Sequence, residues 1–265
     1  MTVAPDAAPP RARQWNRIGG LIWTLVRTDF ATRYHGTVGG FVWALLRPLS
    51  TFVVLMGVFS FVFTNTPRYR IGLILGLFLY EFFQEGTRTG LESLRAKGYL
   101  LTKARFPSWV IVVTSVSNAV ITLTLFSVVL MTFLMLSGRW PGPVAAALYL
   151  WYLLQLFAMV VGFSLAASVL FMRFRDLNQV WEVVTHAGFF VAPIIYPMDV
   201  LPERLHVYLY LWPPTPIILF ARSVLLEGRV PSVLAHGLLA LEATAILTIG
   251  ALIYAARAPR VPEYL

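Results

Sequence analysis

A row of charged residues interrupts one of the apolar segments of this chain. Its members are spaced by 4, 3 and 4 positions and would share one face of a helix: Glu81, Glu85, Arg88 and Glu92. A charge near the centre of a bilayer costs roughly 2.5 to 3.5 kcal/mol, so this face should meet protein or water rather than lipid. Two interpretations stay open, a polar route for a hydrophilic substrate or an ion-paired packing face.

A second polar set recurs every four residues further along the chain, at Asn178, Glu182 and His186. Glutamate and histidine together can pass protons at neutral pH, which would suit a proton relay. A hydrogen-bonded contact between helices explains the same residues. The remaining histidines show no spacing suited to a metal site: His35, His206 and His236.

The composition indicates what kind of elements must position these residues. Hydrophobic residues make up 58% of the chain, charged residues 12%, and the mean hydropathy is +0.73. Ordinary soluble domains do not have this composition, so we expect an all-α membrane protein. The chain has no cysteine, which excludes disulfides and thiol chemistry.

We interpret six apolar segments as membrane crossings: Phe41 to Phe63, Ile71 to Phe83, Val110 to Leu136, Val144 to Leu170, Val180 to Tyr196 and Val233 to Ala256. With both termini in the cytoplasm, six of the 21 basic residues lie outside: Arg68, Arg70, Arg139, Arg204, Arg222 and Arg229. The other fifteen lie inside. Because positively charged loops stay cytoplasmic, this division supports the orientation and explains the basic balance without nucleic acid.

The N-terminal region is expected to remain on the membrane surface. Residues 13–35 project as an amphipathic helix, with apolar residues such as Ile22 and Leu25 on one side and Arg17 and Arg27 on the other. The stretch before it has no apolar core, so a cleavable signal peptide is not expected.

Two short segments precede the last crossing, Pro202 to Leu211 and Pro216 to Leu226. Each has only about half of the roughly 20 residues that a span needs. Asp199 and Thr215 are expected to cap the two helices, and Gly228 to end the second. We predict a re-entrant hairpin of the kind that lines cavities in transporters, with a structured outer loop as the alternative.

The chain has no cofactor site for ATP. A phosphate-binding loop needs Gly-Lys, whereas the only two lysines, Lys97 and Lys103, follow alanine and threonine. If transport is active and not proton-driven, its energy comes from a partner that docks on the cytoplasmic face. The basic loop Arg95 to Trp109 is the best docking surface, although a loop that only fixes the topology would carry the same charges.

Five motifs in order resemble the membrane subunit of type-2 ATP-binding-cassette exporters, of the branch that moves lipid-linked polysaccharides such as O-antigen or wall teichoic acid. They are Arg33-Tyr34 with Gly39-Gly40-Phe41-Val42-Trp43 and Pro48, then Leu100-Leu101-Thr102-Lys103 with Phe106-Pro107, Phe174-Arg175-Asp176-Leu177, Pro193-Ile194-Ile195-Tyr196-Pro197, and Arg222 to Gly228. Each motif is weak alone, and the resemblance covers nearly the whole chain.

The resemblance implies one transmembrane domain over residues 1–265, with an interfacial helix at 13–35, a coupling loop at 95–109 and re-entrant outer helices at 199–228. It implies a homodimer in the bacterial inner membrane, with a channel near its two-fold axis. Two separate ATPase subunits would hold ATP and Mg, and this chain would not be an enzyme. The substrate would be a lipid-linked glycan.

Three groups of residues follow as candidates. The ATPase-coupling set is Arg95, Lys97, Tyr99, Leu101, Lys103, Arg105, Phe106 and Pro107. The cytoplasmic mouth of the channel is assigned to Glu81, Glu85 and Arg88. The outer gate is assigned to Tyr196, Pro197, Tyr208, Tyr210 and Trp212, whose rings could stack on sugars or anchor in the outer leaflet.

Two rival classes remain. A proton-coupled transporter would use Glu182 and His186 and need no ATPase. A membrane enzyme acting on polyprenyl phosphates would need clustered acids, typically a paired-aspartate metal site. The four aspartates are isolated, which argues against the enzyme: Asp6, Asp29, Asp176 and Asp199.

Overall fold

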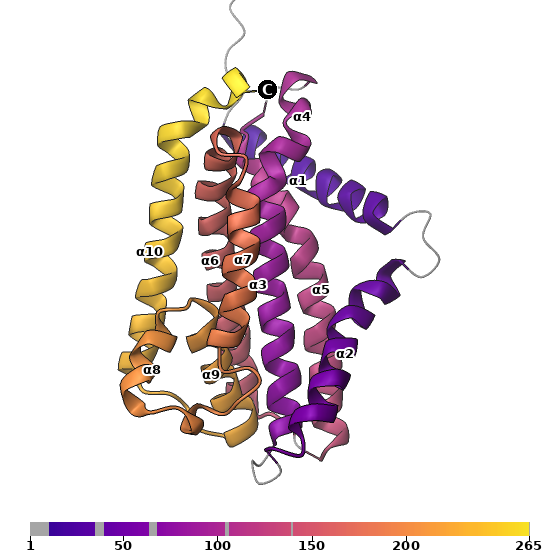
Figure 1. Ribbon diagram of the computed structural model, residues 1–265. Helices are drawn as coiled ribbons and strands as arrows, with labels where there is room; N and C mark the ends of the chain where they lie inside the picture. The colour runs from indigo at the N-terminus through magenta and orange to yellow at the C-terminus, as the bar shows by residue number, and fades with distance from the viewer. Residues whose placement is uncertain (1–10, 35–39, 64–67, 104–105, 139, 265) are drawn as a thin grey trace, which may run out of the picture.

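The computed structural model describes residues 11–34, 40–63, 68–103, 106–138 and 140–264, and these ranges contain helices and no strand (Figure 1). The long helices are α1 (Arg11–Tyr34), α2 (Gly40–Phe59), α3 (Tyr69–Lys97), α5 (Trp109–Leu136), α6 (Pro143–Arg173), α7 (Leu177–Val191) and α10 (Val233–Arg257). The short ones are α4 (Tyr99–Lys103), η1 (Met198–Val200), α8 (Glu203–Tyr210), α9 (Pro214–Arg222), η2 (Ser223–Glu227) and η3 (Ala258–Tyr264).

Helix α3 is the centre of the bundle (Figure 1). Its first three turns, Ile71 to Tyr80, are buried on every side. Helices α5 and α6 pack along it, α10 packs on the far side of α6, and α2 and α7 also contact it. Helix α4 and the C-terminus lie at one end of the bundle, and α8 and α9 lie toward the other. A helix that is apolar all round belongs inside a bundle, which explains this position.

Glycines set two close helix crossings. A Cβ at Gly250 of α10 would lie 1.9 Å from the carbonyl oxygen of Gly162 in α6. A Cβ at Gly90 of α3 would lie 2.0 Å from Oγ of Ser164 in α6. Small residues allow this approach in membrane bundles, where dispersion contacts rather than the hydrophobic effect hold helices together.

In the part of the chain that the structure describes, three helices are long and apolar enough to cross a membrane: α5, α6 and α10. The bent pair of α8 with α9 and η2 would count as a fourth if it forms one broken span. Helix α2 has its apolar part in Leu45–Phe59, and α7 has 15 residues. The chain is therefore a multi-pass membrane protein, and six crossings stay a prediction.

The amphipathic character of α1 is confirmed where its side chains are described. Leu21, Ile22, Leu25 and Val26 are partly buried, whereas Thr24, Arg27 and Thr28 are exposed. The side chains of residues 11–18 lie outside the described set, and so do residues 35–39. Helix α1 contacts α5 at the α4 end of the bundle (Figure 1).

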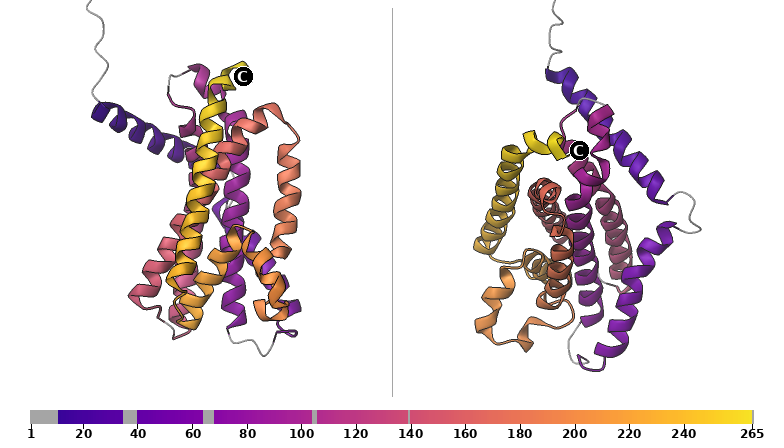
Figure 2. Two further views of the ribbon diagram at one scale, coloured as in Figure 1. Left: turned by 90° about the vertical axis from the view of Figure 1, so that its left-hand side faces the viewer. Right: turned by 45° about the horizontal axis from the view of Figure 1, so that its top comes forward.

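The two short helices before the last crossing are present. They meet at a bend of 115° and form an inverted V whose apex lies inside the bundle (Figure 2, left). Gly228 ends the second one in the left-handed conformation, with φ 69°. The expected caps are wrong. Pro202 and Pro213 occupy the N-cap positions, since Pro214 already begins α9 and places Thr215 inside it.

Candidate functional site

A polar cavity of about 250 Å³ lies between α2, α3 and α7. It joins the two polar sets that the sequence singled out, because one face of α3 and one face of α7 line it together. Its charged residues are Arg47, Glu81, Glu85, Arg88 and Glu182. Neutral polar atoms add to the lining, and the buried Oδ1 of Asn178 has no hydrogen-bond partner among the described residues. Water or a hydroxyl-rich substrate would satisfy that oxygen.

Ion pairs along α3 organise this cavity. The Arg88 guanidinium lies 3.2 Å from the Glu85 carboxylate and 3.8 Å from that of Glu92. The Arg88 side chain is 45% exposed, so these pairs are solvated and inexpensive to rearrange. The geometry combines the two sequence interpretations, because the charged face is ion-paired and also lines a polar cavity.

Aromatic rings close the cavity on the side of the hairpin formed by α8 and α9. Trp181 lines the cavity and stacks on Phe163, with ring centroids 3.9 Å apart. Its indole N–H donates to Oγ1 of Thr87 at 2.9 Å, which fixes the ring. Phe83 and Trp212 follow behind it, with centroids 5.6 Å apart. The sequence signal for this cluster is a tryptophan within the polar first half of α7, between Asn178 and His186.

Trp212 occupies the apex of the hairpin and reaches into the bundle. Its ring packs against Trp181, with centroids 6.3 Å apart. On α7, a Cβ at Gly188 would lie 2.2 Å from the Trp212 ring. Glycine at this position therefore makes room for the indole, and the hairpin apex lies directly behind the cavity wall.

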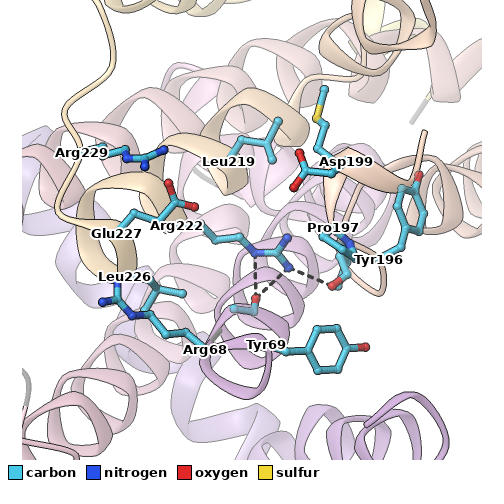
Figure 3. A pocket seen from close by; sticks show the side chains of 13 residues that line it. Arg68, Tyr69, Tyr196, Pro197, Asp199, Leu219, Arg222, Leu226, Glu227 and Arg229 are labelled. Carbon is cyan, nitrogen blue, oxygen red and sulfur yellow. Dashed lines mark hydrogen bonds between the residues drawn. The ribbon is translucent and has the colours of Figure 1, made fainter. Parts of the chain in front are cut away.

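Arg222 holds the opposite end of the hairpin, a role that the sequence analysis did not assign. Its guanidinium donates to the carbonyl oxygens of Gly72, Pro193 and Ile194 through four bonds of 2.5 to 3.0 Å. Figure 3 shows the bonds to Gly72 and Ile194. The start of α3, the break after α7 and the end of α9 are thereby joined. A lone arginine after the apolar run of Pro216 to Ala221 is the signal that could have indicated it.

The predicted outer-gate residues separate into different environments. Tyr196 and Pro197 line a cavity of about 510 Å³ beside Arg222, and the Tyr196 hydroxyl donates to the Val191 carbonyl at 2.8 Å. Tyr208 is exposed. Tyr210 lines a third cavity, of about 290 Å³, between the hairpin and α10. The structure does not bring the five residues to one site, because Trp212 points to the bundle interior.

Two cations of the predicted coupling set contact other helices of the bundle. Lys97 forms an ion pair with Asp29 of α1 and donates to Oγ of Ser115 at 2.9 Å. The Arg95 guanidinium lies 5.4 Å from the centroid of the Phe171 ring. Both residues belong to the last turn of α3, so they tie α1 and α6 to the base of the loop.

The rest of the coupling set surrounds α4, at the end of the bundle that also holds the C-terminus (Figure 1). Three members are exposed: Tyr99, Lys103 and Pro107. The Lys103 ammonium lies 5.6 Å from the centroid of the Tyr99 ring. Leu101 and Phe106 pack partly buried against the core. Arg105 lies outside the described residues.

The two residues of the proposed proton relay have different surroundings, and the relay stays a hypothesis. Glu182 lines the polar cavity, whereas His186 contacts the Phe190 ring at 5.7 Å between centroids and is not in the lining. Among the described residues, no cluster of three or more histidines, aspartates and glutamates could hold a metal ion.

Comparisons with known proteins agree with this architecture. The family described as "ABC-2 type transporter" matches residues 20–226. An O-antigen export system permease protein RfbA from Myxococcus xanthus is 28% identical over 90% of this chain and 92% of its own length. A protein of the same name from Klebsiella pneumoniae is 26% identical over 78% of this chain and 81% of its own length.

Proposed function

Because this chain belongs to the ABC-2 type transporter family, we propose that it is the membrane-spanning channel subunit of an ATP-driven exporter. Its cargo is a lipid-linked polysaccharide of the O-antigen kind, moved from the cytoplasmic side across the bacterial inner membrane. The names of the relatives support this cargo, since each is an O-antigen export permease. The chain itself performs no chemical step.

The polar cavity is the observation that carries the proposal. Its lining of carboxylates, guanidinium groups and amides suits the hydroxyl groups of a sugar chain. Solvated ion pairs such as Arg88 with Glu85 can open and re-form as a polymer slides past. A polymer that slides through the cavity requires weak binding distributed over many groups. Tight binding of its sugars at one position would stop it.

The hairpin apex is proposed to be the gate. Trp212 and Trp181 together separate the cavity from the other end of the bundle. Withdrawal of the apex would open a route past Gly188 toward the exposed ring of Tyr208 and the partly buried ring of Tyr196. Flat aromatic faces there would receive sugar rings as they emerge.

Six crossings with both termini in the cytoplasm complete the proposed topology. Helices α2, α3, α5, α6, α7 and α10 supply them, and α8 with α9 forms the re-entrant outer hairpin. Alternation of direction along these helices supports this arrangement (Figure 1). Two copies of the chain would enclose the channel, with the exposed Glu182 and His186 of α7 toward water rather than lipid.

Two ATP-binding-cassette subunits are proposed to dock at α4. They hold ATP and Mg, so hydrolysis takes place outside this chain. The exposed Tyr99 and Lys103 provide the contact, and the Lys97 ion pair with Asp29 carries a movement of α4 to α1. A short helix with apolar and basic groups suits a groove in the partner.

Co-purification with the genomically adjacent ATPase tests this proposal. The double variant Lys103→Glu with Arg105→Glu reverses two charges in the docking loop. We expect it to lose the complex or at least about 90% of ATP hydrolysis in liposomes, because opposed charges across an interface cost several kcal/mol. The control, Arg257→Glu with Arg260→Glu, reverses two exposed charges at the same end of the bundle and should retain activity. Failure of the unaltered chain to bind any ATPase would contradict the proposal.

A further inference from the structure

The largest of the cavities described above lies at the end of the bundle away from α4. It measures about 510 Å³ and opens between the start of α3, the chain after α7 and the end of η2. Its ionisable lining residues are Arg68, Tyr69, Tyr196, Asp199, Arg222, Glu227 and Arg229 (Figure 3). The volume is in the range of small-molecule sites. The transport proposal assigns only Tyr196 and Pro197 of this lining.

Arg222 gives the cavity a fixed positive wall. Four of the five N–H groups that an arginine carries are bonded to backbone carbonyls, so the guanidinium cannot swing away. Those carbonyls are neutral acceptors, which leaves the charge of the arginine uncompensated by them. Glu227 is the carboxylate whose charge acts on it.

Arg68 and Arg229 provide two movable cations at the rim. Both side chains are exposed, and in the described part of the chain neither guanidinium has a hydrogen bond or an ion pair. No ion pair within 4.0 Å joins them to Asp199 or Glu227 there. Arginine forks without a partner, gathered around one concave surface, are suited to a planar or tetrahedral oxyanion.

The backbone at Arg68 supports a dedicated site. Its φ is 66° and its ψ is 15°, which makes it the one described residue other than glycine with a positive φ. This conformation is unfavourable for a residue with a Cβ, and such positions concentrate at binding sites. The conformation sets Arg68 at the point where the chain turns into α3, on the rim of the cavity.

We propose that this cavity binds a phosphate group. Three arginines against two carboxylates leave one net positive charge, and the several oxygens of a phosphate can engage more than one arginine fork at once. The phosphate can belong to the headgroup of an anionic membrane lipid or to a soluble pyrophosphoryl group. The inference does not depend on the transport proposal, because binding is a property of this chain alone.

Native mass spectrometry of the full chain, released from a maltoside detergent, tests the site. One arm titrates inorganic pyrophosphate and the other titrates dihexanoyl phosphatidylglycerol. The variant Arg68→Gln with Arg229→Gln removes both movable cations, and Arg70→Gln with Arg204→Gln removes two exposed cations of the same end that do not line the cavity. Circular dichroism and size exclusion report whether each variant is folded.

We expect the cavity variant to bind at least about tenfold more weakly than the unaltered chain, and the control variant to bind within about twofold of it. A loss confined to pyrophosphate identifies a soluble group as the source, and a loss confined to the lipid identifies a headgroup. Equal affinities of the two variants, or no binding of either ligand, would overturn the proposal. Should the glutamine variant not fold, Arg68→Lys with Arg229→Lys takes its place, with a loss of at least threefold expected because lysine lacks the fork.

Discussion

The two ends of the bundle hold an arginine in opposite ways. Along the charged face of α3, Arg88 pairs with the carboxylates of Glu85 and Glu92, and rotation of side chains alone can rearrange these pairs. At the opposite end, Arg222 is bonded to the backbone carbonyls of Gly72, Pro193 and Ile194, which cannot move without the helices that carry them. We therefore expect the ion pairs of Arg88 to rearrange easily and the hydrogen bonds of Arg222 to persist.

This difference predicts how the hairpin of α8 and α9, which lies between them, would move. Its α9 end is anchored by four hydrogen bonds of Arg222, whereas its apex is held by ring contacts of Trp212 with Phe83 and Trp181. A hairpin that acts as a gate needs one end that stays in place and another part that can move. The apex is therefore the part of the hairpin that we expect to move, with Arg222 as its pivot.

The largest effect is expected from Arg222→Met, which removes the fixed point. Three carbonyl oxygens lose their donor, and we expect a loss of about 3 to 5 kcal/mol in the free energy of unfolding. Unfolding in mixed micelles of dodecyl sulfate, followed by tryptophan fluorescence, measures this. Arg70→Met, at an exposed position on α3, should change stability little. Equal stability of the two variants would show that Arg222 is no anchor.

Gly188→Ala should displace the movable point. The new methyl group would lie 2.2 Å from the Trp212 ring, so we expect a loss of about 1 to 3 kcal/mol and a shifted apex. Because the chain has no cysteine, a single Gln84→Cys change in the cavity lining reports accessibility, and its labelling by a thiol reagent should become faster. Gly237→Ala is the matched control, since no atom lies within 4 Å of its Cβ. An unchanged labelling rate at position 84 would show that the position of the apex does not control access to the cavity.

Trp181→Phe tests the aromatic wall that separates the polar cavity from the hairpin apex. It keeps a ring against Phe163 but removes the hydrogen bond to Thr87, so we expect a loss of about 1 kcal/mol. Thr87→Val removes the acceptor instead, and the double variant should be no less stable than the worse single variant. Additive losses in this cycle would mean that the indole N–H does not hold the wall through Thr87.

The smallest change in stability is expected from Arg88→Gln. Its ion pairs are solvated, so the free energy of unfolding should change by less than about 1 kcal/mol. ATP-dependent export should nevertheless fall several-fold, because the cavity loses one of its two cations. A decrease of several kcal/mol in the free energy of unfolding, without any change in export, would show that the charged face of α3 serves only in packing.

The sequence predicted the parts of this arrangement that depend on periodicity. The spacing of Glu81, Glu85 and Arg88 placed them on one face, and the prolines and Gly228 indicated the two short helices. It did not predict that this face and the one carrying Glu182 meet in a single cavity, because the pairing of α3 with α7 is a long-range contact. Other contacts between residues far apart in the sequence could not be predicted for the same reason.

Three residues illustrate that limit. Trp212 was assigned to the outer gate as part of an aromatic group, but only its contact with Gly188 shows that it points inward. The sequence placed Lys97 in a basic loop. In the structure it forms an ion pair with Asp29, which lies far away along the chain. Arg222 resembled a topology signal, and its bonds to three distant carbonyls give it a structural role.

The most direct test of the account is movement of a lipid-linked glycan by the reconstituted complex. Proteoliposomes holding this chain and its ATPase would receive a fluorescently labelled glycan carrier, and a membrane-impermeant quencher would report its transfer to the other face. We predict transfer that requires ATP and this chain, continues without a pH gradient, and is lost in Lys103→Glu with Arg105→Glu. Transfer driven by a pH gradient without the ATPase would contradict the account and favour the proton-coupled mechanism.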